Sequence, residues 1–477
     1  MGAIFVMWLR KLTSRVDLTE GKPWKVILLF SIPVFFSLIL NNAFLLINAL
    51  VLKVTVGGDS VTAVNSTASI NSIIFQFAYG ASGGFALLIS EYVGKKEYSE
   101  VKKIFYNGTY LAIFVGLFCS VIGLIFYKDL LSLLNVNERY FTKAYQYLEI
   151  LLIGFIFTLL NNYFSNALRA MGDSFAPLVI SLIGAFINVS SAFLFTGVFS
   201  LDTKGVALAT ILSHIISAVI TYLYMIRKYD FLSGKVIKKI DKKISIKMLC
   251  LGFPLGFQWS VLYIGSFFQD RTINAFGNGL ATKAVSCYSP FISYLTMPIS
   301  AIANAVLSYV GQNYGKRDID RIIKGVKNCI VIDFIIYILI MIIGFSLLKY
   351  VPYIYLPKDE LDIGSEGPIV KYYCYTYLKI ILPCFIMQGL LTTFRSVVQG
   401  IQRTFVTLIS GFGELGARIF VCAVIPSLIN PSNPLSDESF IGVCFSTPFA
   451  WFMSLVIMGI GSYYFIKKEK EKINNEI

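Results

Sequence analysis

The sequence predicts an all-α polytopic membrane protein with twelve transmembrane helices arranged as two six-helix bundles. The first reason is composition, because 56% of the 477 residues are hydrophobic and only 14% are charged, whereas a soluble domain carries about 25% charged residues. The second reason is that the apolar residues form runs long enough for helices of ~20 residues to cross the bilayer. The third reason is an internal repeat that relates the two halves of the chain.

Twelve apolar runs follow one another along the sequence. Most contain no charged residue, and the three at 328–348, 372–394 and 405–429 contain one or two. The other expected spans are 26–52, 60–90, 104–127, 150–168, 174–201, 205–226, 248–269, 284–314 and 439–466.

The spans divide the chain into five segments. We expect residues 1–22 to be an amphipathic segment on the membrane surface, because apolar and basic residues are interleaved between Trp8 and Val16. The remaining segments are a first six-helix bundle at 23–227, a basic linker at 228–247, a second bundle at 248–466 and a tail at 467–477.

The positions of the basic residues predict the topology. The loops on one side of the membrane, together with both chain ends, hold most of the 41 Lys and Arg residues. Since cytoplasmic loops are enriched in Lys and Arg, we expect both termini in the cytoplasm and the protein in the cell membrane. The net charge of +14 then reflects contact with an anionic lipid leaflet, and we expect no nucleic-acid partner.

The two halves of the chain align without a gap at an offset of 221 residues. Pro33 matches Pro254, and the Gly-Lys pair at Gly94 matches the one at Gly315. The offset grows to about 230 where Gly172 aligns with Gln402. Six spans in each half give both halves the same orientation, so the sequence favours parallel repeats with a substrate path at their interface.

Three stretches carry a resemblance to a known family. They are Tyr92–Lys96, Val310–Gly315 and Leu251–Gln258, and with the repeat they resemble the multidrug and toxic compound extrusion (MATE) transporters of low-GC Gram-positive bacteria. The resemblance covers about residues 18–466. It implies two pseudo-symmetric parallel bundles around a central V-shaped cavity, and export of organic cations driven by Na⁺ or H⁺.

The resemblance also implies a cation site in the first bundle, and this sequence departs from it. The family's usual Asp in span 1 and second Asp in span 5 fall at Asn48 and Ala192, whereas the usual Asn and Thr are kept at Asn188 and Thr210. The family's acidic position early in span 7 falls near Leu262. An amide cannot exchange a proton at neutral pH, so we expect any site here to bind Na⁺ through neutral oxygens of Asn48, Asn188 and Thr210.

Ionisable residues inside a bilayer are candidates for function because their burial is costly. Asp270 follows Gln269, the repeat mate of Asn48, so we consider it a replacement coupling carboxylate. The alternative for Asp270 is an ion pair with Arg271 or another neighbour. Glu414 and Arg418 have the i,i+4 spacing of a helical ion pair. The alternative is that Glu414 faces the cavity and that Arg418 changes the pKa of the Glu414 carboxylate.

Other polar residues in the spans have structural interpretations. Asp333 is expected to meet a polar neighbour, and His214 to bond to one. The remaining candidates either hydrogen-bond between helices or line the cavity, and they are Asn41, Asn42, Asn161, Asn162 and Asn166.

Three other classes of membrane protein are alternatives. A major-facilitator transporter is disfavoured because the loop at 94–98 lacks the Asp-Arg pair of that class, and a flippase for lipid-linked substrates stays open as a relative of the same fold. An intramembrane enzyme would need a catalytic cluster, and no phosphate-binding GxxxxGK[ST] motif is present. We therefore expect no catalytic residue and no cofactor beyond a coupling ion.

The eight cysteines are interpreted as free thiols, and we expect a monomer that handles amphiphilic small molecules in the lipid bilayer.

Overall fold

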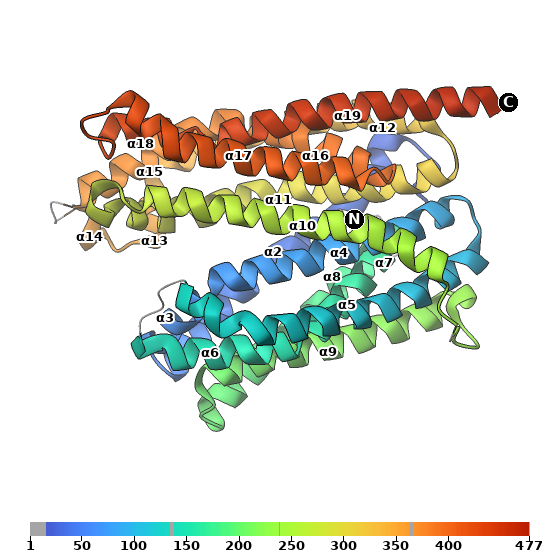
Figure 1. Cartoon of the computed structure of the whole chain (residues 1–477), viewed down its shortest axis with the longest axis horizontal. Helices are drawn as coiled ribbons and strands as arrows, with labels where there is room; N and C mark the ends of the chain where they lie inside the picture. The colour runs from blue at the N-terminus through green and yellow to red at the C-terminus, as the bar shows by residue number, and fades with distance from the viewer. Residues whose placement is uncertain (1–15, 134–137, 238, 363–365, 477) are drawn as a thin grey trace, which may run out of the picture. The chain divides into compact units, whose positions relative to one another are not determined.

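The computed structural model describes residues 16–133, 138–237, 239–362 and 366–476. Within these ranges the chain is helical and contains no β-strand (Figure 1). The first fifteen residues of the expected amphipathic segment lie outside the described residues.

The expected helical membrane architecture is confirmed. Eleven helices of the described chain are long and apolar enough to cross a membrane, and the number rises to twelve if one bent pair is counted as a span. That pair is α6 (Glu138–Ile153) and α7 (Phe155–Ala170), which meet at an angle of 52°. Gly154 separates them and lies against the side chain of Ile211, in keeping with the tendency of helices to bend at glycine.

The first compact unit contains residues 1–260, 308–318 and 399–404. Besides α6 and α7, it holds α2 (Pro23–Thr55), α3 (Gly58–Ser66), α4 (Ala68–Gly94), α5 (Tyr98–Leu133), α8 (Phe175–Phe193), the π-helical turn η1 (Leu194–Val198), α9 (Asp202–Lys228), the turn η2 (Asp230–Leu232) and the start of α10 (Lys242–Ile273).

The second compact unit contains residues 261–307, 319–398 and 405–477. Its helices are α11 (Leu280–Gly315), α12 (Ile319–Leu347), α13 (Val351–Tyr355), α14 (Lys358–Asp362), α15 (Gly367–Ile381), α16 (Phe385–Gly400), α17 (Thr404–Ile429), α18 (Asp437–Cys444) and α19 (Ser446–Glu476), with the 3₁₀ turns η3 (Phe276–Gly279), η4 (Leu348–Tyr350) and η5 (Leu382–Cys384). The last residues of α11 and α16 and the first residue of α17 belong to the first unit.

Several helices continue past the apolar runs. The expected linker at 228–247 is helical from Lys242 onward, and the expected tail belongs to α19 as far as Glu476. The apolar run at 60–90 is divided between α3 and α4. Hydrophobicity locates the part of a helix that lies in lipid, but charged residues can extend the same helix into water.

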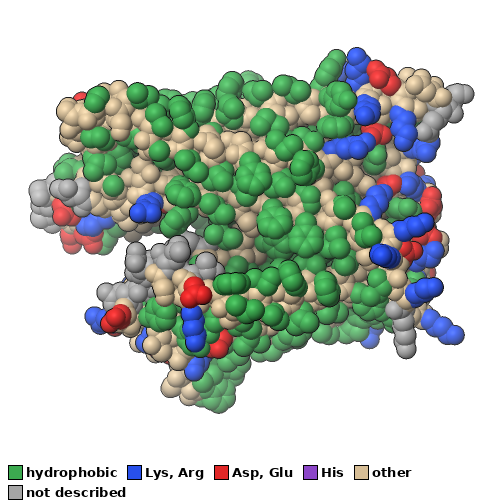
Figure 2. Space-filling view, in the orientation of Figure 1, with side chains coloured by type: hydrophobic (Ala, Val, Ile, Leu, Met, Phe, Trp, Pro, Cys, Tyr) green, Lys and Arg blue, Asp and Glu red, His purple; other side chains and the backbone are tan. Residues whose placement is uncertain are grey.

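Large apolar side chains cover the flanks of the helices. In the apolar windows of α5 and α12 only 28% and 22% of residues are buried, and Phe114 and Val331 are among their exposed side chains. Within each unit, the charged side chains gather toward helix ends and hydrophobic side chains cover the flanks (Figure 2). This distribution is that of a protein surrounded by lipid.

The internal repeat extends to the backbone. Lys96 and its mate Arg317 both adopt a left-handed conformation, with φ of 62° and 63°, just after the ends of α4 and α11. The later mates Gly172 and Gln402 also share it, with φ of 89° and 65°. The helix ends and turns expected to be equivalent therefore have equivalent conformations.

Glycines bring the ends of α4 and α11 into backbone contact within the first unit. A Cβ atom on Gly94 would overlap the backbone of Gln312, and one on Gly315 would overlap the backbone of Glu91. Glu91 and Gln312 are 221 residues apart, as Gly94 and Gly315 are, so the contact is reciprocal. Only a residue without a side chain permits this approach.

The reciprocal contact predicts an unusual sensitivity to one methyl group. Gly94→Ala and Gly315→Ala are each expected to lower stability by about 1–3 kcal/mol, because the backbones must move apart. Gly416→Ala is the control: no heavy atom outside its own helix lies within 4 Å of a Cβ there, and alanine favours helix. Thermal unfolding in detergent measures all three, and a Gly94→Ala protein as stable as Gly416→Ala would contradict the prediction.

Candidate functional site

A polar group lies among apolar side chains at the junction of α2, α8 and α9 in the first unit. The Asn188 amide donates to the Thr210 hydroxyl at 3.4 Å. Asn48 belongs to α2, which packs against α8 and α9 through a small apolar cluster that includes Val51 and Ala192. The structure thus brings Asn188 and Thr210 together and places Asn48 on a helix that packs beside them.

The amide oxygens of this group have no hydrogen-bond partner. Oδ1 of Asn48 and Oδ1 of Asn188 are both buried and unpaired among the described residues. Buried acceptors are nearly always satisfied in folded proteins, and neutral oxygens of this kind are ligands for hard cations. Ala192 is fully buried in the apolar cluster, so its side chain offers no ligand.

The second unit contains a buried ion pair that differs from the expected one. Glu414 on α17 pairs with Arg395 on α16, and not with Arg418. Arg418 instead donates to the Ser266 hydroxyl of α10 at 2.6 Å. The prediction of an i,i+4 pair between Glu414 and Arg418 is therefore wrong, because each side chain finds a partner on another helix.

The Arg395–Glu414 pair lies in a polar cluster formed by three helices. Arg395 also donates to Ser454 of α19 at 3.1 Å, and Ser410 of α17 shares a hydrogen bond with Ser454. Arg395 and Glu414 are 7% and 3% exposed. In a low-dielectric interior such a pair holds its helices in register, since each charge depends on the other.

Gln269 and Asp270 are neighbours in sequence but have different surroundings. The Gln269 amide donates to Tyr377 at 3.2 Å and accepts from Thr447 at 2.8 Å. Asp270 is exposed on α10 and makes no ion pair or hydrogen bond through its side chain with any described residue. The expected alternative of an Asp270–Arg271 pair is thus not formed, although Arg418 is near enough to act on Asp270 electrostatically.

Two structural interpretations are confirmed. Asp333 of α12 accepts a hydrogen bond from Thr393 of α16 at 2.7 Å, and His214 of α9 bonds to Thr158 of α7 at 2.9 Å. Both contacts link neighbouring helices in their units.

The asparagines have mixed roles. Asn166 joins α7 to Ser82 of α4 at 3.0 Å, as expected of an interhelical hydrogen bond. Asn42 bonds only within its own helix, to the carbonyl oxygen of Leu38. Asn41 and Asn162 form no side-chain hydrogen bond with the described residues, which leaves them as candidates for cavity lining.

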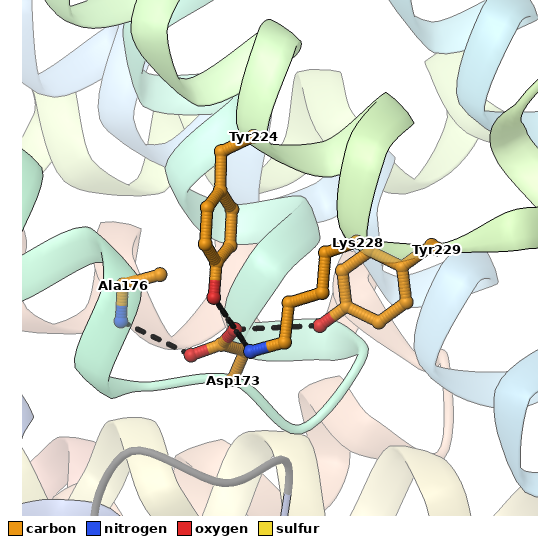
Figure 3. Close-up of polar contacts among 5 residues, drawn as sticks. All are labelled: Asp173, Ala176, Tyr224, Lys228 and Tyr229. Carbon is orange, nitrogen blue, oxygen red and sulfur yellow. Dashed lines mark hydrogen bonds and ion pairs between the residues drawn. The ribbon is translucent and has the colours of Figure 1, made fainter.

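A buried carboxylate that was not among the candidates lies at the turn before α8 (Figure 3). Asp173 is 1% exposed. One of its oxygens accepts from Lys228 at 2.8 Å, Tyr224 at 3.0 Å and Tyr229 at 3.4 Å, and the other accepts from the backbone N–H of Ala176 at 3.0 Å. The position after a glycine turn and before a helix is the one signal in the sequence. With all its oxygens paired, Asp173 fastens the start of α8 to the end of α9.

Sequence reasoning also missed two arginines. Arg395 and Arg169 were placed in loops, but they lie within α16 and α7. Arg169 donates to Asn166 at 3.0 Å, which extends the polar contact between α7 and α4. Groups of three or more His, Cys, Asp or Glu residues able to hold a metal ion do not occur in the described part of the chain.

Comparison with known proteins gives consistent results. The family model described as MatE matches residues 33–194 and 262–424, once in each half. The probable multidrug resistance protein YoeA of Bacillus subtilis is 24% identical over 95% of this chain and 96% of its own length. An FAD transporter of Shewanella oneidensis is 21% identical over 87% of this chain and 88% of its own.

A solved structure has the same fold. A transporter of the MOP superfamily from Pyrococcus furiosus, described as having a binding pocket of reverse polarity, superposes with a TM-score of 0.84. The two chains are 18% identical, and the match covers 96% of this chain and 99% of the other.

The buried ion pair yields a prediction about stability. Arg395→Gln leaves the Glu414 charge buried and unpaired, and is expected to lower stability by about 3–5 kcal/mol. The double variant Arg395→Gln/Glu414→Gln removes both charges and is expected to recover most of that loss. Unfolding in detergent measures both.

The control is an exposed pair. Lys103 and Glu100 lie 2.6 Å apart on α5, and Lys103→Gln is expected to change stability by less than about 1 kcal/mol. A double variant as unstable as Arg395→Gln would show that the two residues do not act as a pair.

Proposed function

The chain belongs to the MATE family of transporters, and from that membership we propose that it exports hydrophobic and cationic small molecules by antiport against Na⁺ or H⁺. The family match in both halves of the chain is the observation that carries this proposal. The two bundles alternate between states open to either side of the membrane, as expected of parallel repeats. Transport, and not catalysis, is the activity.

The location, orientation and oligomeric state of the protein in this proposal are those expected from the sequence. The protein lies in the cell membrane with both termini in the cytoplasm, in agreement with the distribution of Lys and Arg. It acts as a monomer on amphiphilic substrates that reach it from the bilayer, without a nucleic-acid partner and with no cofactor other than the coupling ion.

In the first bundle, the coupling ion is Na⁺. The unpaired oxygens of Asn48 and Asn188, with the hydroxyl of Thr210, support a site of neutral ligands. Such a site can coordinate Na⁺ but cannot release a proton. Without a carboxylate, its affinity for Na⁺ is lower than that of a charged site.

In the second bundle, Asp270 is the coupling carboxylate. Glu414 already has a guanidinium partner in Arg395, whereas Asp270 has no ion-pair or hydrogen-bond partner among the described residues. The hydrogen bonds of Gln269 to Tyr377 and Thr447 hold the adjacent backbone in place. Asp270 is therefore the carboxylate free to bind a cation, with Arg418 near enough to act on it electrostatically.

The decisive experiment is transport by purified protein in proteoliposomes. Ethidium is the cationic probe, FAD is an anionic contrast, and Na⁺ and H⁺ gradients are imposed separately. We expect ethidium movement to be accelerated at least fivefold by one of the gradients. A wild-type protein that responds to neither gradient would overturn the antiport proposal, and transport of FAD alone would favour an anionic substrate class.

Substitution of Asp270 tests its role as the coupling carboxylate. Asp270→Asn is expected to abolish most of the acceleration by the gradient while downhill ethidium movement persists, because a neutral amide does not exchange its charge. Asp359→Asn, at an exposed carboxylate of α14, is the matched control. Full coupling in Asp270→Asn would exclude this assignment.

The neutral site is tested through its sodium dependence. Asn48→Ala and Asn188→Ala each remove one amide oxygen, so the Na⁺ concentration for half-maximal transport is expected to rise about three- to tenfold. Asn65→Ala serves as the control because Asn65 is exposed on α3 of the same unit. An unchanged sodium dependence in both alanine variants would remove the site from the mechanism.

A further inference from the structure

Two side chains, here called arms, extend from the ends of α4 and α11. Each arm contacts the opposite repeat. Glu91 belongs to the first repeat and Gln312, its mate, to the second. Each lies beside the glycine contact formed by Gly94 and Gly315, and all the residues involved belong to the first compact unit.

The arm formed by Glu91 is charged. Its carboxylate accepts from Lys247, at the start of α10, at 3.1 Å and from Gln402, after α16, at 2.7 Å. Gln402 belongs to the second repeat, and Lys247 lies in α10, the helix with which the second repeat begins. Lys95, four residues along the same helix, binds the other oxygen at 2.5 Å. Glu91 is 7% exposed, so its charge depends on these contacts.

The arm formed by Gln312 is neutral. Its amide nitrogen donates to the carbonyl oxygen of Ala170 at 2.8 Å, and its amide oxygen accepts from the backbone N–H of Leu18 at 3.3 Å. Ala170 ends α7 in the first repeat, just as Gln402 follows α16 in the second. Each arm therefore binds the turn that follows the fourth span of the opposite repeat.

Gln402 is held in a backbone conformation that disfavours it. Its φ is 65°, and its repeat mate at the same turn is a glycine, Gly172. Left-handed backbone is unfavourable for residues with a side chain, and strained residues tend to occur where the side chain has a function. The contact that the Gln402 side chain gains is its hydrogen bond to Glu91.

We propose that Glu91, Lys247 and Gln402 form a latch that holds the two repeats together at this end and must open in every transport cycle. The proposal rests on the proposed function, since alternating access requires the repeats to separate on one side at a time. Lys247 and Lys95 are partly exposed, with 49% and 29% of their side chains accessible. Water can therefore replace the contacts of the carboxylate when the latch opens.

A reversible crosslink tests whether the latch must open. Glu91→Cys and Lys247→Cys are introduced into a chain whose eight native cysteines are replaced by alanine, and the two thiols are joined by a bis-methanethiosulfonate reagent matched in length to the original pair. We expect the linked protein to move ethidium at less than a tenth of the unlinked rate, and a reductant to restore transport. Each single cysteine variant, treated identically, is the control.

Three results of the crosslink experiment would overturn the proposal. These are full transport in the linked protein, failure of the two thiols to link, and absence of transport in the unlinked double variant, since an unlatched protein should still cycle.

A set of single variants separates a latch from a purely local role of Glu91. Lys247→Ala and Gln402→Gly each remove a contact with the second repeat, whereas Lys95→Ala removes one within α4. We expect the first two to lower the half-saturating ethidium concentration at least threefold, because weakening the latch populates the binding-competent state. Lys95→Ala is expected to change it less than twofold. Equal effects in all three would contradict the latch.

Gln402→Gly separates the role of Gln402 in its turn from its role in the latch, because the substitution should relieve backbone strain and also remove the hydrogen bond to Glu91. We expect the thermal midpoint to be unchanged or raised while hydrogen–deuterium exchange at 308–318 and 399–404 increases at least fivefold. A raised midpoint with unchanged exchange would show that Gln402 serves the turn alone. Exchange does not depend on a substrate, so it decides on the latch even if wild-type protein moves no ethidium and the proposed function fails.

Discussion

The close approach of α4 and α11 is the constraint on which the first unit depends. Gly94 and Gly315 allow two backbones to touch where any side chain would separate them. Because the contact is reciprocal, it fixes both helix ends at once. The turn after α16 then lies within reach of Glu91, and the end of α7 within reach of Gln312. Polar side chains can form hydrogen bonds between the repeats because the glycines allow the two backbones to lie so close together.

The two units differ in how their buried polar side chains are paired. In the first unit, the group at Asn48, Asn188 and Thr210 is neutral and leaves two acceptors unpaired. In the second, Arg395 and Glu414 bring opposite charges together inside the bundle. A buried neutral group that is unpaired until a ligand binds costs a moderate amount of free energy, whereas a buried charge needs a permanent partner. The first arrangement suits an exchangeable ion, and the second suits a fixed helix contact.

Much of the fold could be predicted because lipid imposes simple rules. Long apolar runs located the spans, and an offset of 221 paired Gly94 with Gly315. Boundaries were less accessible: the expected span at 372–394 ended one residue before Arg395, so the partner of Glu414 was taken for a loop residue. Gly154, at the bend between α6 and α7, lies against Ile211, a contact between distant residues that no local pattern reveals. Asn48 and Asn188 were identified by resemblance, but only the coordinates show that their amide oxygens are unpaired.

The difference between Glu91 and Gln312 has a consequence for the two halves of the chain. A protein made of two identical first repeats would carry glutamate at both positions, and the second carboxylate would face the carbonyl oxygen of Ala170, acceptor against acceptor. Two identical second repeats would leave Lys247 without its carboxylate. Neither half can replace the other, because each of these two side chains fits only the contacts of its own position.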